Sequence, residues 1–258
     1  MLTDQQKSHY DVFGFLHLKQ VFTQDEMKIF GRECDRILER FRHGKPFDGK
    51  ERQNQEPFFE HSPVLTKYLE DDRVYLIGEQ LLGQNPVLVG TEANLHIGDT
   101  QWHAADPSDM PSLKIAFYLE ANTKDTGALR VIPGSHKPVF SKTLSPLMRQ
   151  CDDQSGMPFG VCGTDFPSFT LETQPGDLVV FPECIWHAAF GGRPGRTQHA
   201  VSLLANPSTE ERKAATRKLY DSFQVSLRPP ESLIQSDSSR LRSLVKPLVD
   251  LGFEPAKI

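Results

Sequence analysis

The chain changes texture near residue 86, and this change most constrains its fold. Beyond it, short β-prone runs are separated by Gly-Asp, Pro-Gly and Gly-Gly pairs, which favour turns. Helical patterns first and many short strands afterwards are typical of a sandwich or jelly roll with a helical outer layer. We therefore expect a mainly β, α+β chain with flanking helices. The predicted strands are Val87–Val89, Ala93–Ile97, Leu113–Leu119, Leu129–Ile132, Leu178–Phe181 and Ala200–Leu204.

The first part of the chain has helical periodicity. The segment from Thr23 to Glu26 has the pattern of a capping box, and apolar residues then recur on one helical face. This pattern predicts a helix over residues 24–41. Ser62 and Pro63 fit an N-cap and a first helical position, because proline lacks an N–H that would be unsatisfied there anyway. We expect helical structure to resume after them.

A length of 258 residues suits a single domain, because β sandwiches and barrels often reach this size undivided. We expect a mainly helical layer over residues 1–85, in which the polar segment 42–60 forms a long, lid-like loop. Residues 86–205 would form the β core. Residues 206–258 would add one helix and a tail in which no periodicity predicts an element.

Composition excludes several classes of function. The net charge of -5 and the pI near 6.0, with scattered basic residues, argue against a nucleic-acid partner. The start of the chain lacks the pattern of a secretory signal, and no apolar run is long enough to span a membrane. The four cysteines show no Cys-x-x-Cys spacing, which argues against a zinc ribbon or a redox pair. We expect a cytoplasmic protein, and the sequence does not predict its oligomeric state.

Three ordered motifs carry the chemistry: Gln101 to Asp106, Gly127 to His136, and Trp186-His187 followed by Arg196. Together they resemble the phytanoyl-CoA dioxygenase family over roughly residues 86–205. The resemblance implies a double-stranded β-helix (jelly roll, cupin-like) and an oxidoreductase that depends on Fe(II) and 2-oxoglutarate. Such an enzyme hydroxylates or otherwise oxidises an unactivated C–H bond of a small molecule with molecular oxygen, and releases succinate and CO2.

The resemblance assigns iron-ligand roles to His103 and His187. Two imidazoles and a carboxylate on one face of the iron leave the opposite face for a bidentate 2-oxo acid and oxygen. The resemblance also implies that Arg196 holds the distal carboxylate of 2-oxoglutarate, since a guanidinium can clamp a carboxylate through two parallel hydrogen bonds. Ser202, on the same predicted strand face, and Lys114 with Tyr118 on another strand are further candidate contacts for 2-oxoglutarate.

The chain departs from the family pattern at the iron carboxylate. Relatives carry His-x-Asp, but Ala105 stands two residues after His103. Asp106 follows one residue later, and strand alternation would turn it to the opposite face unless the chain bulges. Asp106 could still be the ligand through a turn at Pro107. Alternatively, Ala105 leaves room for chloride or bromide as in related halogenases, or it marks an altered variant.

Four functions therefore stay open. Oxygenation comes first, as the commoner outcome in the family, and halogenation second. A jelly roll that binds a small ligand without catalysis fits the missing carboxylate, and a cupin-like hydrolase or isomerase with another divalent metal would ignore 2-oxoglutarate. The substrate is expected to enter beneath the loop 42–60, with walls formed by Asn94, Gln101, Trp102 and Phe190.

Overall fold

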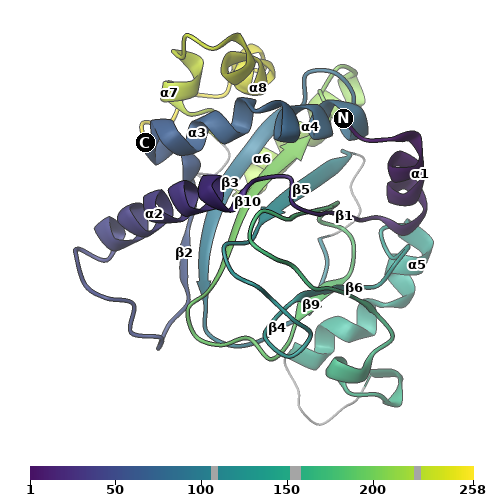
Figure 1. Cartoon of the computed structure of the whole chain (residues 1–258). Helices are drawn as coiled ribbons and strands as arrows, with labels where there is room; N and C mark the ends of the chain where they lie inside the picture. Colours follow the sequence, from purple (N-terminus) through teal and green to yellow (C-terminus); the bar gives the residue numbers. More distant parts are fainter. Residues whose placement is uncertain (106–109, 152–157, 224–227) are drawn as a thin grey trace.

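The computed structural model describes residues 1–105, 110–151, 158–223 and 228–258 (Figure 1). Its centre is a pair of antiparallel sheets that face each other as a jelly roll. The six strands of the larger sheet are, in spatial order, β1 (Leu16–Leu18), β8 (Leu178–Phe181), β5 (Ser112–Phe117), β10 (Arg196–Leu204), β3 (Val87–His96) and β2 (Gln53–Gln55). The four strands of the smaller sheet are β4 (Thr100–His103), β9 (His187–Ala189), β6 (Leu129–Val131) and β7 (Phe169–Leu171).

Strand β10 separates the interior of the jelly roll from the helical layer. Its neighbours are β3, with Arg196 opposite His96, and β5, with Ser202 opposite Lys114. Because side chains alternate along a strand, Arg196 and Ser202 share the face toward the smaller sheet. His199 lies on the other face, where its ring packs against helix-side phenylalanines.

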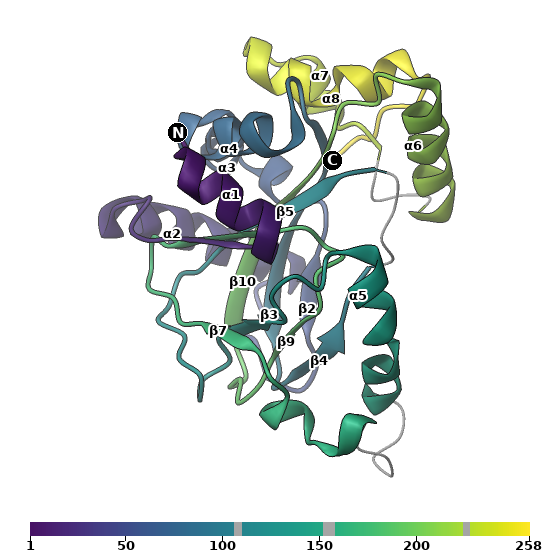
Figure 2. The ribbon, with the colours of Figure 1, turned by 90° about the vertical axis from the view of Figure 1, so that its right-hand side faces the viewer.

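Helices cover the outer face of the larger sheet, while the smaller sheet lies on its other side (Figure 2). The helix predicted over residues 24–41 is confirmed as α2, with a complete capping box at Thr23. Within the described ranges, no helix combines the length and the apolar character needed to cross a membrane. The α-helices are α1 (Asp4–Phe13), α2 (Gln24–Phe41), α3 (Pro63–Glu70), α4 (Asp72–Leu82), α5 (Pro138–Thr143), α6 (Glu210–Phe223), α7 (Glu231–Ile234) and α8 (Ser239–Asp250). Short 3-10 helices are η1 (Phe59–His61), η2 (Ser145–Cys151), η3 (Pro158–Gly160) and η4 (Gly163–Asp165).

Several local predictions were wrong in detail. Residues 42–60 are not one loop, because Gln53–Gln55 pair with β3 as an edge strand. The helical segment after Ser62 is two helices, since Asp71 adopts an extended conformation and caps α4. The runs 87–89 and 93–97 were predicted as separate strands, but one continuous strand spans Val87–His96. Helices α7 and α8 occupy the tail for which the sequence predicted no element.

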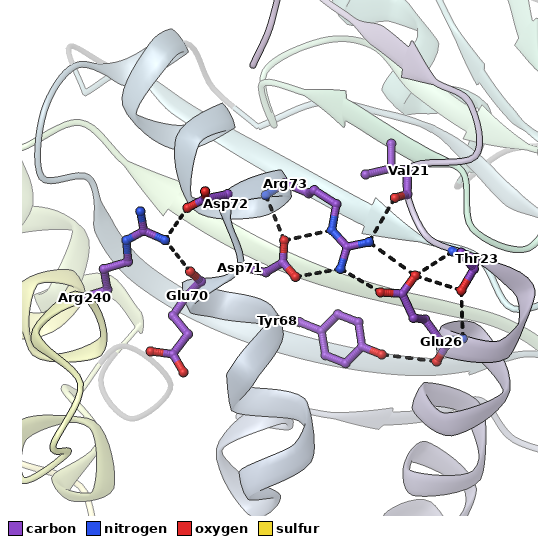
Figure 3. A network of polar contacts seen from close by, with 9 residues as sticks. All are labelled: Val21, Thr23, Glu26, Tyr68, Glu70, Asp71, Asp72, Arg73 and Arg240. Carbon is purple, nitrogen blue, oxygen red and sulfur yellow. Dashed lines mark hydrogen bonds and ion pairs between the residues drawn. The ribbon is translucent and has the colours of Figure 1, made fainter.

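A polar network ties the helices together on one side of the layer (Figure 3). The Arg73 guanidinium donates to Asp71 and Glu26, at 2.7 and 2.8 Å, and so connects the starts of α4 and α2. The same group lies 4.0 Å above the ring of Phe22. Arg240 of α8 donates to the Glu70 carbonyl oxygen at 2.8 Å. These contacts hold the helices in one arrangement against the sheet.

Candidate active site

Two histidines face each other in the smaller sheet. His103 of β4 lies directly opposite His187 of β9, and their ring centroids are 4.0 Å apart. The Nδ1 atom of each ring lies 2.8 Å from a backbone carbonyl oxygen, of Gln101 and Ile185 respectively. A carbonyl oxygen only accepts, so each Nδ1 carries the proton and each Nε2 keeps a lone pair. This arrangement is typical of imidazoles that bind a metal.

The surroundings keep both rings neutral. Burial lowers the pKa of His103, and burial together with the neighbouring His103 ring holds the pKa of His187 well below its usual value. The neutral imidazole is the form that ligates metals. The pair therefore fits the role of two nitrogen ligands.

At position 105, where the resemblance implies a carboxylate ligand, the side chain is the methyl group of an alanine. The Ala105 N–H donates to the Glu183 carbonyl oxygen at 3.0 Å, which places position 105 beside the chain that leads into β9. Asp106, the other candidate for this ligand, lies outside the described residues. In the part of the chain that the structure describes, no three His, Cys, Asp or Glu side chains are gathered closely enough to hold a metal ion.

Arg196 lies buried at one end of the interior, with 3% of its surface exposed. Its Nε atom has no hydrogen-bond partner among the described residues. Two glycines make room for it: a Cβ at Gly127 would lie 2.6 Å from Cδ of Arg196, and a Cβ at Gly192 would lie 3.1 Å from Nε. Tyr118 lies close enough for the two groups to affect each other's pKa. A buried guanidinium with an unused Nε–H in a glycine cradle fits a carboxylate ligand.

Lys114 and Ser202 are already engaged by carboxylates that the sequence analysis did not single out. The Lys114 ammonium lies 3.1 Å from Glu92 and 3.1 Å from Glu183, and the Ser202 hydroxyl donates to Glu183 at 3.0 Å. Burial alone would lower the pKa of Lys114, but the two carboxylates raise it above its usual value. Lys114 and Ser202 therefore form a charged cluster with Glu92 and Glu183. This cluster lies toward the other end of β10 from Arg196.

The residues predicted to form the substrate wall do not come together. Asn94 faces the interior on β3, where its side-chain oxygen accepts from Arg52 and Asn54. Gln101 is exposed. Trp102 and Phe190 pack in a buried cluster on the outer face of the smaller sheet, and Trp102 donates to the Gly163 carbonyl oxygen at 2.8 Å. Neither aromatic ring is placed to contact a molecule beside His103.

Comparison with known proteins agrees with this geometry. The family model for phytanoyl-CoA dioxygenase (PhyH) matches residues 10–200. The chain belongs to the phytanoyl-CoA dioxygenase family. Membership explains the order of the three sequence motifs, and it makes Ala105 the departure from the family pattern that has to be explained.

Among its relatives are ectoine dioxygenases. The Streptomyces coelicolor protein is 30% identical over 146 residues, which are 48% of either chain. The Bordetella bronchiseptica protein is 27% identical over 163 residues, covering 54% of this chain and 51% of the relative. The chain thus spans about half the length of the curated relatives it matches.

Solved structures show the same fold. HygX from Streptomyces hygroscopicus, with nickel and 2-oxoglutarate bound, superposes with a TM-score of 0.62 at 18% identity and covers 79% of this chain and 87% of its own. EctD from S. alaskensis with bound Fe gives 0.58 at 19% identity, over 79% and 76% of the two chains. The double-stranded β-helix predicted from the sequence is confirmed.

Proposed function

We propose that this chain is an Fe(II)- and 2-oxoglutarate-dependent dioxygenase that hydroxylates an unactivated C–H bond of a small molecule. The observation that carries the proposal is the facing pair His103 and His187, with both Nδ1 atoms tied to backbone carbonyls. The buried, incompletely bonded Arg196 adds a site for the second carboxylate of 2-oxoglutarate. The relatives and the metal-bound neighbours support the same chemistry.

The protein's own residues bind and orient. His103 and His187 would hold iron through Nε2, and the backbone carbonyls behind them keep the rings from rotating. Arg196 would pair with the distal carboxylate of 2-oxoglutarate in the buried interior, where a charge-assisted pair is strong. When bound, iron and 2-oxoglutarate supply the oxidising power for C–H cleavage. The chain supplies position and exclusion of water.

The test separates an enzyme from a binding protein. Purified protein is mixed with Fe(II) and 2-oxoglutarate without oxygen, the charge-transfer absorption band is recorded, and succinate is measured after oxygen is admitted. We expect the band and slow uncoupled succinate formation, both lost in His103→Ala and retained in His9→Ala, a change at an exposed residue. A band without succinate would indicate a binding module. If neither the band nor succinate appears, the result favours a hydrolase or isomerase with another metal.

Halogenation is the second candidate, and Ala105 is the observation that favours it. A small side chain there leaves a ligand position for chloride or bromide. However, Glu92 and Glu183 outnumber Lys114 close to this position, and an excess of negative charge opposes binding of an anion. We therefore keep oxygenation first. A chloride-dependent change of the absorption band that disappears in Ala105→Asp would reverse this order.

The substrate is proposed to be small and polar, and to enter beneath the segment 42–60. Ectoine is the first compound to test, because the relatives named above are ectoine dioxygenases. Polar side chains toward the interior, among them Asn94, Glu92 and Ser202, are consistent with a hydrophilic molecule. Substrate-dependent stimulation of succinate formation over the uncoupled rate identifies a true substrate.

A further inference from the structure

The gap at Ala105 is bordered by a glutamate on the neighbouring strand connection. The Ala105 N–H and the Glu183 carbonyl oxygen are 3.0 Å apart, so the two residues start from adjacent points of the backbone. The side chain of Glu183 turns toward the interior, because its carboxylate contacts Lys114 and Ser202 there. A glutamate is one methylene longer than the aspartate that relatives carry at position 105. Its carboxylate therefore extends further from the backbone than that of an aspartate would.

The charges around Lys114 leave one carboxylate in excess. A single ammonium is within 3.1 Å of both Glu92 and Glu183, although one carboxylate is enough to neutralise it. Glu92 is the more enclosed partner, with 16% of its side chain exposed against 36% for Glu183. Glu183 is thus the carboxylate that can leave Lys114 at the smaller cost, because Glu92 still pairs with the ammonium.

We propose that Glu183 supplies the anionic metal ligand that Ala105 does not, and that it exchanges Lys114 for the metal when the metal binds. The inference rests on the proposed function, since it concerns the metal site built on His103 and His187. Glu183 lies in the short connection between β8 and β9, and the exchange would change its side-chain torsions. Ser202 then donates to the carboxylate oxygen that does not face the metal and orients it.

The exchange accounts for a site that lacks a preassembled triad in the described residues. Two neutral imidazoles alone are a weak set for a hard divalent cation, and a carboxylate restores both charge balance and a facial arrangement. It also accounts for the cluster itself. Without metal, Lys114 keeps the Glu183 carboxylate in the interior. A divalent metal ion, which attracts a carboxylate more strongly than an ammonium does, would then take its place.

The experiment measures metal affinity in the full chain, with Mn(II) as the probe and isothermal titration calorimetry as the readout. Glu183→Gln is expected to raise the Mn(II) Kd at least about tenfold, the smallest effect expected from loss of a metal-site partner. The matched control is Glu56→Gln, which removes another carboxylate that lies near Glu92, Lys114 and Glu183. We expect the control to change the Kd less than about threefold, an effect of charge alone.

A rescue variant guards against a general effect on folding. Ala105→Asp in the Glu183→Gln background returns the carboxylate to the family position and is expected to restore the wild-type Kd. In the wild-type background, Ala105→Asp should increase the Mn(II) affinity much less, because the effects of two residues that fill one role are not additive. Equal gains in both backgrounds would overturn the proposal.

Three further outcomes are decisive. A tenfold weaker Kd in Asp106→Asn, with Glu183→Gln unchanged, would assign the ligand to Asp106 and sink the inference. His103→Ala tests the underlying site: if it binds Mn(II) as tightly as the wild type, the proposed function fails. If His103→Ala loses Mn(II) while Glu183→Gln keeps it, the metal site stands and only the role of Glu183 is wrong.

Discussion

Among single residues, substitutions of Arg196 and Arg193 are expected to have different effects on 2-oxoglutarate binding, although the two residues lie close together in the sequence. Arg196 is buried in a glycine cradle, whereas 67% of the Arg193 side chain is exposed and its nearest carboxylate, Glu120, is 3.8 Å away. Arg196→Leu should raise the half-saturating 2-oxoglutarate concentration at least about a hundredfold, since truncating one side of a buried charged pair costs about 3 to 5 kcal/mol. Mn(II) affinity should stay unchanged. Arg193→Leu should leave both quantities near the wild type, and an equal loss in the two variants would place the clamp elsewhere.

At the scale of elements, Arg73 joins helices that sequence periodicity describes only one at a time (Figure 3). It bonds Glu26 and Asp71 and covers the Phe22 ring, so several contacts between elements depend on one side chain. Arg73→Met should lower the free energy of unfolding in urea by about 1 to 2 kcal/mol, because hydrogen bonds to two carboxylates are lost together. The control is Lys28→Met, which breaks an exposed pair with Asp25 within α2 and should cost less than about 0.5 kcal/mol. Equal costs would mean that the network adds nothing beyond surface pairing.

At the scale of the whole molecule, buried neutral histidines make stability depend on pH. Burial lowers the pKa of His199 to about 3, against 6.5 for the exposed group, and neither ring nitrogen has a hydrogen-bond partner among the described residues. Below pH 6.5 the His199 side chain is protonated in the unfolded chain but stays neutral in the folded chain. The free energy of unfolding is therefore highest above pH 6.5 and falls as the pH drops toward 3. The slope is about 1.4 kcal/mol per pH unit for each such group. His199→Phe should raise the free energy of unfolding by about 1 to 2 kcal/mol at neutral pH and flatten the acid limb measured by urea unfolding. An unchanged acid limb would show that His199 is hydrated or protonated in the folded state.

Local patterns determined the parts of this protein whose physics is local. The capping box at Thr23 and the helical spacing after it specify α2, because cap and periodicity are read from residues within a few turns. Alternation along β10 separates Arg196 and Ser202 from His199, since adjacent strand residues must point to opposite faces. The order of His103, His187 and Arg196 could likewise be recognised from the sequence alone.

Features that depend on contacts between residues far apart in the sequence are defined only by the tertiary structure. Residues 53–55 become a strand only because β3 offers an unpaired edge, and the three-residue β9 needs its neighbours β4 and β6 to exist at all. Trp102 alternates with His103 on β4, but only the packing of the η2 region shows that its ring is enclosed on the outer face. The cluster of Lys114 with Glu92 and Glu183 joins three strands or connections with no common motif. Charge pairing across a barrel follows from folding, and no local spacing records it.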